Sequence, residues 1–467
     1  MAHAAPLADA PELCRLDAAA LTRRYADGSF SPVEATEAAL RRAEEVQARC
    51  NAFSHLDPEG ACAAARASEA RWRAGRPLGP LDGVPATIKD IVWVRGWTVR
   101  YGTRAVPGVQ AEEDAPAVAQ LRAAGAVLLG LTTTPEFGWK AVTDCALTGI
   151  TRNPWDASRT PGGSSGGAAV AAACGAGVVH LGTDGGGSIR IPAAFCGVVG
   201  HKPSFGRVPA YPASPFGTVA HLGPIARTVA DAALMLEAMS GRDARDWYQS
   251  PWPLPSVTPI AARPLRGLRV AVWETPPHGT VAPDVREAFA RALDRIADAG
   301  AAITRVALPA ESLWELFRLH WHSGAAARLA GVPEDARDQI ESGLREIAAD
   351  GARLSALDLI AAQTRRAAFG AAFDRLVAAH DVLLSPAAAL TAFAAGTEVP
   401  PGSGHGRWTE WAGFSYPINL AQSPASVVPC GFGANGMPVG LQIVGRRGDD
   451  AGVLAAAAAV EGLFAAA

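Results

Sequence analysis

Residues 160–167 read Thr-Pro-Gly-Gly-Ser-Ser-Gly-Gly, and residues 183–190 read Thr-Asp-Gly-Gly-Gly-Ser-Ile-Arg. Each segment sets a serine among glycines, Ser164 in the first and Ser188 in the second. From residue 160 to residue 183 the chain carries no Asp, Glu, Lys or Arg and is rich in glycine and alanine. Such small side chains are too weakly apolar to span a bilayer. We therefore expect a loop followed by a buried helix that packs through small side chains.

Lys89 ends a short apolar run that follows a turn at residues 81–85. None of the three segments contains a histidine, so a serine nucleophile here needs another proton acceptor. An ordinary lysine, with a pKa near ~10.4, is a poor base at neutral pH. Burial disfavours the ammonium form and can lower this pKa by ~3–5 units. Lys89, Ser164 and Ser188 are therefore the candidate catalytic residues.

Strand-like and helix-like patterns alternate along the chain. A capping box at residues 31–34 predicts a helix that begins there. Strands are expected at 126–131, 178–181, 267–273, 302–306, 381–384, 426–429 and 439–444, and helices at 31–48, 58–74, 114–124, 285–299 and 449–464, with 311–380 mainly helical. This alternation favours an α/β sandwich over a helix bundle or an all-β fold.

Composition narrows the classes of function. The chain has 467 residues, 49% of them hydrophobic and 19% charged, so a sizeable core can be buried. The 42 basic and 45 acidic residues are well mixed, so neither nucleic acid nor a membrane surface is an expected partner. Seven cysteines without a CxxC pair argue against a disulfide framework or a zinc site. No signal peptide pattern opens the chain, which favours a cytoplasmic location.

The two glycine clusters have competing interpretations. Residues 163–167 match the GxSxG elbow of α/β-hydrolases, but that elbow follows a buried strand, whereas residues 151–161 have the composition of a loop. In the second cluster, three glycines before Ser188 leave backbone N–H groups unshielded. Such groups can converge on one oxygen as an oxyanion hole, although a tight turn without a ligand has the same sequence.

Further motifs carry a family resemblance. Residues 152–155 (Arg-Asn-Pro-Trp), 195–197 (Phe-Cys-Gly) and 428–445, taken with the segments above, closely resemble the amidase signature family. The likeness is dense over residues 80–230 and 415–447. It implies one domain over 1–467, with an N-terminal helical part (1–78), a signature core (79–235), a variable substrate-lining part (236–380) and C-terminal strands and helix (381–467). The implied fold is a single large α/β/α sandwich with a central mixed, twisted sheet flanked by helices.

The resemblance also assigns roles. It implies that Ser188 is the nucleophile that forms an acyl-enzyme, that Ser164 is a bridging serine on a cis peptide bond, and that Lys89 is the base. The implied oxyanion hole comprises the backbone amides of Gly185, Gly186, Gly187 and Ser188. The remaining residues near these positions are expected to support them: Asp184 and Arg190 by bracing the loop, and Ser165 by holding Ser164 or capping the helix that follows.

The implied reaction is cleavage of the C–N bond of a small-molecule amide, with carbamates and esters as further substrates. Trp93, Tyr101 and Trp139 fall in segments that line the pocket of similar enzymes, which suggests an apolar or aryl amide. Departures from the family pattern at Ile91, Thr134, Gly185, Gln422 and Ser423 are expected to shape this pocket. Trp314, Phe317 and Trp321 lie three to four residues apart on an expected helix, where core packing is the simpler interpretation.

Two other functions stay open. One is the glutaminase subunit of a tRNA-dependent amidotransferase, which shares the three catalytic positions, although residues 309–331 lack the Tyr- and Asn-rich segment of such subunits. The other is a non-catalytic scaffold on the same fold, which the intact catalytic positions disfavour. Neither a metal nor an organic cofactor is expected, because no ligand spacing is present. The expected partners are the substrate and water, and a homodimer is left open.

Overall fold

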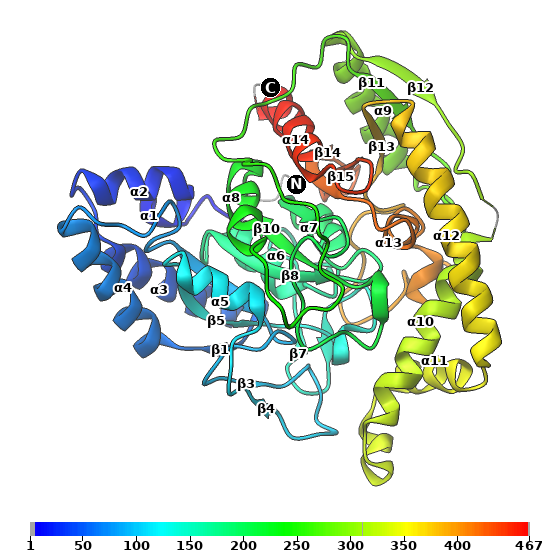
Figure 1. Cartoon of the computed structure of the whole chain (residues 1–467), viewed down its shortest axis with the longest axis horizontal. Helices are drawn as coiled ribbons and strands as arrows, with labels where there is room; N and C mark the ends of the chain where they lie inside the picture. Colours follow the sequence, from blue (N-terminus) through cyan, green and yellow to red (C-terminus); the bar gives the residue numbers. More distant parts are fainter. Residues whose placement is uncertain (1–4, 311, 466–467) are drawn as a thin grey trace.

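The computed structural model describes residues 5–310 and 312–465. A mixed sheet of 11 strands passes through the molecule, and helices flank it (Figure 1). Its strand order is β1-β5-β2-β8-β10-β9-β14-β15-β13-β11-β12. The strands of this sheet are β1 (Phe53–Leu56), β2 (Pro85–Lys89), β5 (Val127–Thr132), β8 (Val179–Asp184), β9 (Val199–Lys202), β10 (His221–Ala226), β11 (Arg269–Val272), β12 (Ala302–Arg305), β13 (Val382–Pro386), β14 (Ala425–Phe432) and β15 (Pro438–Val444).

Parallel and antiparallel pairs are both present. β2 runs parallel to β5 and β8, and β11 runs parallel to β12 and β13. The other neighbouring pairs are antiparallel, including β8 with β10 and β14 with β15. Two short hairpins lie outside the sheet: β3 (Thr98–Val99) with β4 (Val109–Gln110), and β6 (Asp144–Cys145) with β7 (Gly149–Ile150).

Helices occur in every part of the chain. They are α1 (Glu12–Arg15), α2 (Ala18–Ala26), α3 (Pro32–Cys50), α4 (Pro58–Arg73), α5 (Pro116–Ala123), α6 (Gly166–Cys174), α7 (Arg190–Cys196), α8 (Val229–Met239), α9 (Pro283–Asp298), α10 (Leu313–Ala330), α11 (Ser342–Ala352), α12 (Ala356–Ala378), α13 (Tyr416–Leu420) and α14 (Asp450–Ala465). In Figure 1 the first four lie on the side of the molecule away from α10, α11 and α12.

The sheet separates two hydrophobic cores. Successive residues of a strand point to opposite faces. Accordingly Val427 belongs to one buried cluster and Val428 to the other, and Leu383 and Leu384 are divided in the same way. The first cluster includes α6 and α7, and the second includes α5, α8 and α14. The mixed sheet flanked by helices that the sequence predicts is confirmed.

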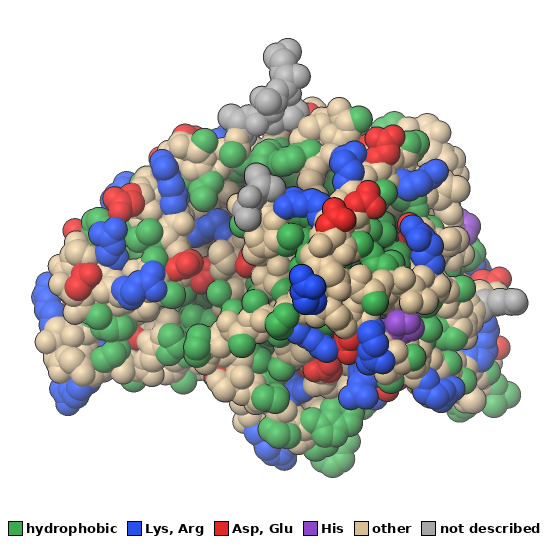
Figure 2. All heavy atoms as spheres, turned by 90° about the horizontal axis from the view of Figure 1, so that it is seen from above, with side chains coloured by type: hydrophobic (Ala, Val, Ile, Leu, Met, Phe, Trp, Pro, Cys, Tyr) green, Lys and Arg blue, Asp and Glu red, His purple; other side chains and the backbone are tan. Residues whose placement is uncertain are grey.

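The surface carries charges of both signs. On the face shown in Figure 2, basic and acidic side chains are interspersed among apolar and neutral ones. All seven cysteines are free thiols. Across the described ranges, no helix has both the length and the apolar character that crossing a bilayer requires.

Candidate active site

Lys89 is the last residue of β2, a strand whose five residues are all buried. The parallel register of β2 with β8 places Ile88 beside Leu181, so the lysine lies near the end of β8. Its Nζ contacts three hydroxyl oxygens, Ser164 Oγ at 2.6 Å and both Ser165 Oγ and Thr183 Oγ1 at 2.9 Å. Burial lowers the pKa of Lys89 well below its ordinary value, while Asp184 acts in the opposite sense. Burial therefore favours the neutral amine form of this side chain.

Ser164 is held by a loop that only small residues can form. The Gly163–Ser164 peptide bond is cis. A Cβ on Gly163 would lie 2.5 Å from the carbonyl carbon of Val142, so the backbone itself fills the space of a side chain. The helix that follows, α6, is buried along its whole length, as its alanine-rich sequence predicts. Close backbone packing thus fixes Ser164 at the end of this helix.

Ser165 supports the lysine and not the helix. It stands at the N-cap of α6, but its side chain makes no capping hydrogen bond. Its Oγ accepts from Lys89 Nζ and from the Thr183 N–H at 3.2 Å, and it donates to the Thr183 carbonyl at 3.1 Å. The capping role proposed from the sequence is therefore wrong. Ser165 instead ties Lys89 to the end of β8.

Ser188 lies in the turn between β8 and α7, five residues beyond Thr183. It is 6% exposed and lines the same cavity as Ser164. Its carbonyl accepts from the Ser165 N–H at 3.1 Å, which couples the two serine loops. Within the described residues its Oγ has no hydrogen-bond partner in the protein. The hydroxyl is therefore available to a ligand in the cavity.

Of the four backbone amides expected to form an oxyanion hole, one is already engaged. The Gly187 N–H donates to Asp184 Oδ1 at 2.8 Å, so it cannot serve a bound oxygen. For Gly185, Gly186 and Ser188, no protein acceptor is found among the described residues. The Gly187 amide is not available because the turn directs it back toward Asp184 at the end of β8. The three remaining amides are the candidate donors.

Asp184 and Arg190 brace this turn, as expected. Both side chains are fully buried, and Arg190 Nη2 lies 2.9 Å from Asp184 Oδ1. Asp184 Oδ2 also accepts from the Ile189 N–H at 3.1 Å. Burial by itself would raise the pKa of Asp184, but the Arg190 guanidinium, together with Lys202 and Asn419, outweighs burial and the net pKa is lowered. Arg190 in turn donates to Asn419 and Gln442. The ion pair between Asp184 and Arg190, here called the Asp184–Arg190 clasp, therefore joins the turn to α13 and β15.

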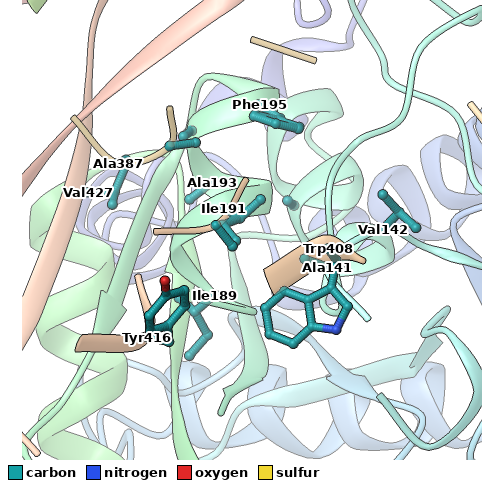
Figure 3. Packing of buried hydrophobic residues seen from close by; sticks show 14 of the residues in the cluster. Ala141, Val142, Ile189, Ile191, Ala193, Phe195, Ala387, Trp408, Tyr416 and Val427 are labelled. Carbon is teal, nitrogen blue, oxygen red and sulfur yellow. The ribbon is translucent and has the colours of Figure 1, made fainter. Parts of the chain in front are cut away.

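Aromatic side chains close over the glycines of the turn. A Cβ on Gly185 would lie 2.8 Å from the Trp321 ring, and one on Gly186 would lie 2.7 Å from Trp408 and 2.8 Å from Phe317. In Figure 3, Trp408 and Tyr416 lie in the buried cluster with Ile189 and the residues that follow it in α7. The turn therefore has no room for side chains.

A cavity opens above Ser164, Thr183 and Ser188. Apolar and aromatic side chains make up much of its lining: Ile91, Val92, Tyr101, Phe137, Phe205, Val208, Tyr211, Phe216, Leu222, Tyr248 and Trp321. The charged residues in the lining are Asp184, Asp246 and Arg328. Trp321 stacks on Phe216 with ring centroids 4.0 Å apart, so these two rings form one wall.

Two of the three aromatic residues expected in the pocket lie outside its lining. Tyr101 lines the cavity. Trp93 lies behind it, with Nε1 donating to the Tyr101 hydroxyl at 2.6 Å. Trp139 is 2% exposed, and its indole N–H donates to Glu341. Both tryptophans therefore support the wall from behind and do not face the cavity.

Only some of the other residues expected near the pocket line the cavity. Ile91 and Gly185 line the cavity, whereas Thr134, Gln422 and Ser423 do not. On α10, Trp321 lines the cavity, Phe317 is buried against Tyr416, and Trp314 stacks on His278. Core packing thus accounts for part of this helix face and the cavity wall for the rest.

Comparison with known proteins places this arrangement in a family. The sequence matches the amidase family over residues 34–454. The chain belongs to the amidase signature family. It is 37% identical over 473 residues to a glutamyl-tRNA(Gln) amidotransferase subunit of Chloroflexus aggregans, covering 95% of both chains. It is also 37% identical over 461 residues to an acylamidase of Rhodococcus erythropolis, covering 96% of this chain and 95% of that one. The crystal structure of a bacterial aryl acylamidase of the same family matches with a TM-score of 0.88, 29% identity and 96% coverage of both chains.

Within this member of the amidase signature family, sequence reasoning missed two polar contributors. Thr183 contacts Lys89, and Asn419 donates to Asp184 Oδ1 at 2.9 Å. Thr183 directly precedes Asp184 in the Ser188 motif, so its position in the sequence could have indicated a role at the site. Asn419 is distant from this motif in sequence, and no sequence pattern indicated its role. The three histidines at 180, 201 and 221 are buried, and burial lowers the pKa of each. His180 and His201 lie in the core, whereas His221 also lines the cavity.

One group of side chains among the described residues has atoms close enough to hold a metal ion. Ligand atoms of His278, His405 and Glu410 lie within 4.8 Å of one another. His405 Nδ1 lies 3.5 Å from Glu410 Oε2, and the Gly406 N–H donates to the same carboxylate. None of the three lines the cavity, and internal contacts account for their positions.

Proposed function

We propose that the protein is a stand-alone amidase that cleaves the C–N bond of a small-molecule amide through an acyl-enzyme on Ser188. The observation that carries the proposal is a buried lysine, its pKa lowered by burial, with Nζ 2.6 Å from the Oγ of Ser164, which lines a cavity together with Ser188. A neutral amine can accept a proton, and a hydroxyl can both donate and accept one. This combination supplies a base without a histidine.

The hydrogen bonds around Lys89 allow such a relay. A neutral amine has two N–H groups and one lone pair, so one of its three hydroxyl neighbours must donate to it. Ser164 has the shortest contact, so its proton can pass to Nζ. Ser188 Oγ has no protein partner among the described residues, and the proposed relay requires it to turn toward Ser164 Oγ in the cavity that both serines line and to give its proton to that oxygen. The Ser188 oxygen then attacks the carbonyl carbon. Reversal of the relay protonates the leaving amine, and water releases the acyl group by the same path.

Charge that develops on the carbonyl oxygen needs preorganised donors. The free backbone amides of Gly185, Gly186 and Ser188 can supply them. The Asp184–Arg190 clasp holds the turn that carries these amides, because it fixes the Gly187 and Ile189 N–H groups. We therefore assign the clasp a positioning role.

The lining supports an apolar acyl or amine group on the substrate. Phe137, Phe216 and Trp321 offer flat apolar surface close to the serines. The relatives named as acylamidase and aryl acylamidase fit the same class of substrate. Aryl amides and anilides are therefore the proposed substrates, with aryl carbamates and esters as further ones.

A hydrolysis screen over anilides, primary amides, aryl carbamates and esters tests the proposal. We expect turnover of anilides and a fluorophosphonate adduct located by mass on Ser188, and S188A should show neither. Normal labelling without turnover of any C–N substrate would contradict amide hydrolysis. Unlabelled Ser188 in folded protein would favour a scaffold role.

A second candidate is the glutaminase subunit of a tRNA-dependent amidotransferase. The 37% identity to the Chloroflexus aggregans protein favours it. This function predicts glutamine as the preferred substrate and stable association with partner subunits. Turnover of anilides but not glutamine by the chain alone would exclude it.

A further inference from the structure

Arg328 is a cation in the cavity that the proposed reaction does not use. It lies in the last turn of α10 and lines the cavity with Ser164 and Ser188. Its guanidinium carbon lies 5.1 Å from the centre of the Phe137 ring and 5.5 Å from that of Tyr101. Both rings also line the cavity. Stacking on aromatic faces leaves the N–H groups at the edge of a guanidinium free to bind.

No protein group neutralises this guanidinium. Among residues 5–310 and 312–465, Arg328 forms no salt bridge and no side-chain hydrogen bond, and its Nε is buried without a partner. The two carboxylates of the cavity are occupied elsewhere. Asp184 pairs with Arg190, and Asp246 accepts the N–H groups of Ala210 and Tyr248, both at 2.8 Å.

An unpaired charge in a partly buried site costs free energy. Arginine stays charged at any physiological pH, so it cannot avoid this cost by losing a proton. The other arginines that bury their guanidinium near the turn have acceptors: Arg190 has Asp184, and Arg366 has the Leu420 carbonyl at 2.8 Å. An anionic group on a ligand is the partner that Arg328 lacks.

We propose that Arg328 is an anion subsite that selects amides carrying a carboxylate near the scissile bond. The inference rests on the proposed amidase function and names its substrate class. Phe137 precedes Gly138, and a Cβ on Gly138 would lie 3.3 Å from Ser164 Oγ. Arg328 is therefore stacked on Phe137, and the next residue in the chain, Gly138, borders the bridging serine Ser164. Because Arg328, Ser164 and Ser188 line one cavity, a single small ligand can reach both the guanidinium and the serines.

Matched pairs of anilides test this subsite. One series has an acyl chain of increasing length that ends in a carboxylate, and its partner ends in a neutral hydroxymethyl group. A second pair carries the same two groups on the aniline ring. For at least one pair we expect the wild-type kcat/KM of the carboxylate substrate to exceed that of its neutral partner by about 10- to 100-fold. This ratio corresponds to the free energy of one hydrogen bond to a charged group. R328M should reduce that ratio to near one, and R328K should keep part of it.

Arg318 provides the control. It lies on the same helix with its guanidinium carbon 4.9 Å from the Trp314 ring, but outside the cavity lining. R318M should keep the wild-type ratio. Should R328M fold poorly, competitive inhibition of wild-type anilide hydrolysis by benzoate but not benzamide gives the second readout. Ser188 labelling and a thermal melt report folding.

The outcomes separate the two proposals. Turnover of neutral anilides with no carboxylate preference in any pair overturns the anion subsite and leaves the amidase function standing. A ratio that R328M does not change also overturns it. Absence of turnover in both series, with Ser188 unlabelled, overturns the amidase function and the subsite together.

Discussion

Two buried lysines, Lys89 and Lys202, differ in their hydrogen-bond neighbours, and the difference shows which contacts allow a lysine to act as a base. Burial lowers the pKa of both Lys89 and Lys202 well below the ordinary value. Lys202 Nζ donates to the carbonyl oxygens of Pro203 and Ser423, which have no proton to give. Lys89 instead contacts three hydroxyls, each of which can donate a proton as well as accept one. Burial favours the neutral form of either amine, but only the neighbours of Lys89 can pass it a proton.

Replacing Lys89 by methionine should lower kcat for an anilide by about 10²- to 10⁴-fold, the usual contribution of a positioned base. In the wild type, activity should be lost as pH falls through the lowered pKa of Lys89, because the ammonium form cannot accept a proton. The plateau should therefore be reached below pH 10.5, the ordinary lysine value. Rate measurements from pH 5 to 10 check both points. Full activity in K89M would refute the assigned base.

Gly185 and Trp321 illustrate how one residue sets the cavity wall. A Cβ at Gly185 would lie 2.8 Å from Trp321 Cζ3, closer than real contacts allow. G185A should lower kcat/KM by about 10- to 100-fold, because either the ring or the turn beside Ser188 must move. G185A/W321F should regain part of the loss, since the smaller ring vacates that space. An additive double mutant would show that the two positions do not interact.

Much of the site could be predicted from short motifs, but its hydrogen-bond directions could not. The motifs named Lys89, Ser164 and Ser188, and the fold places the lysine against Ser164 and both serines at one cavity. They did not show that the Gly187 N–H turns toward Asp184, because that depends on the backbone path. Nor could aromatic composition separate Tyr101, which faces the cavity, from Trp93, which lies behind it. Which aromatic side chain faces the cavity and which lies behind it is set by tertiary packing.

At the level of elements, regular patterns were predicted well and irregular ones were not. The capping box at Ser31 and Glu34 marks the start of α3, and helix α9 follows its amphipathic spacing. Strand β10 contains Pro224, which is unusual inside a sheet, and it was not predicted. The short helix α7 is buried on all sides, so it has no periodic pattern to detect. Burial on every face removes the signal that periodicity provides.

The Asp184–Arg190 clasp links several elements, and its loss should be costly. R190M leaves a fully buried carboxylate without its partner and should lower the free energy of unfolding by about 3–5 kcal/mol. D184N/R190M should recover part of that, because the amide carries no charge. Denaturant unfolding of the three proteins measures both effects. Equal stability of the single and double variants would contradict a charge-based cost.

Across the whole molecule, burial of neutral histidines links folding to pH. His180 lies in β8, with Nδ1 2.8 Å from Thr87 Oγ1, and burial lowers its pKa to about 3. In the unfolded chain its pKa returns to the ordinary value of 6.5. Below that pH the unfolded state binds a proton that the folded state does not. Stability attributable to His180 is therefore present above pH 6.5 and is lost as pH falls toward 3.

The variant H180N isolates this effect. Between pH 7 and pH 5 the free energy of unfolding of the wild type should fall by about 2 kcal/mol more than that of H180N. Over about 1.5 pH units of this range the unfolded state holds one proton on His180 that the folded state does not, and this difference corresponds to that energy. Any cavity that asparagine leaves lowers stability equally at both pH values, so it cancels in the difference. Asp231, whose pKa burial raises to about 6, acts in the opposite sense but is present in both proteins. Urea unfolding of both at the two pH values measures the difference, and parallel losses would show that His180 is protonated in the folded state.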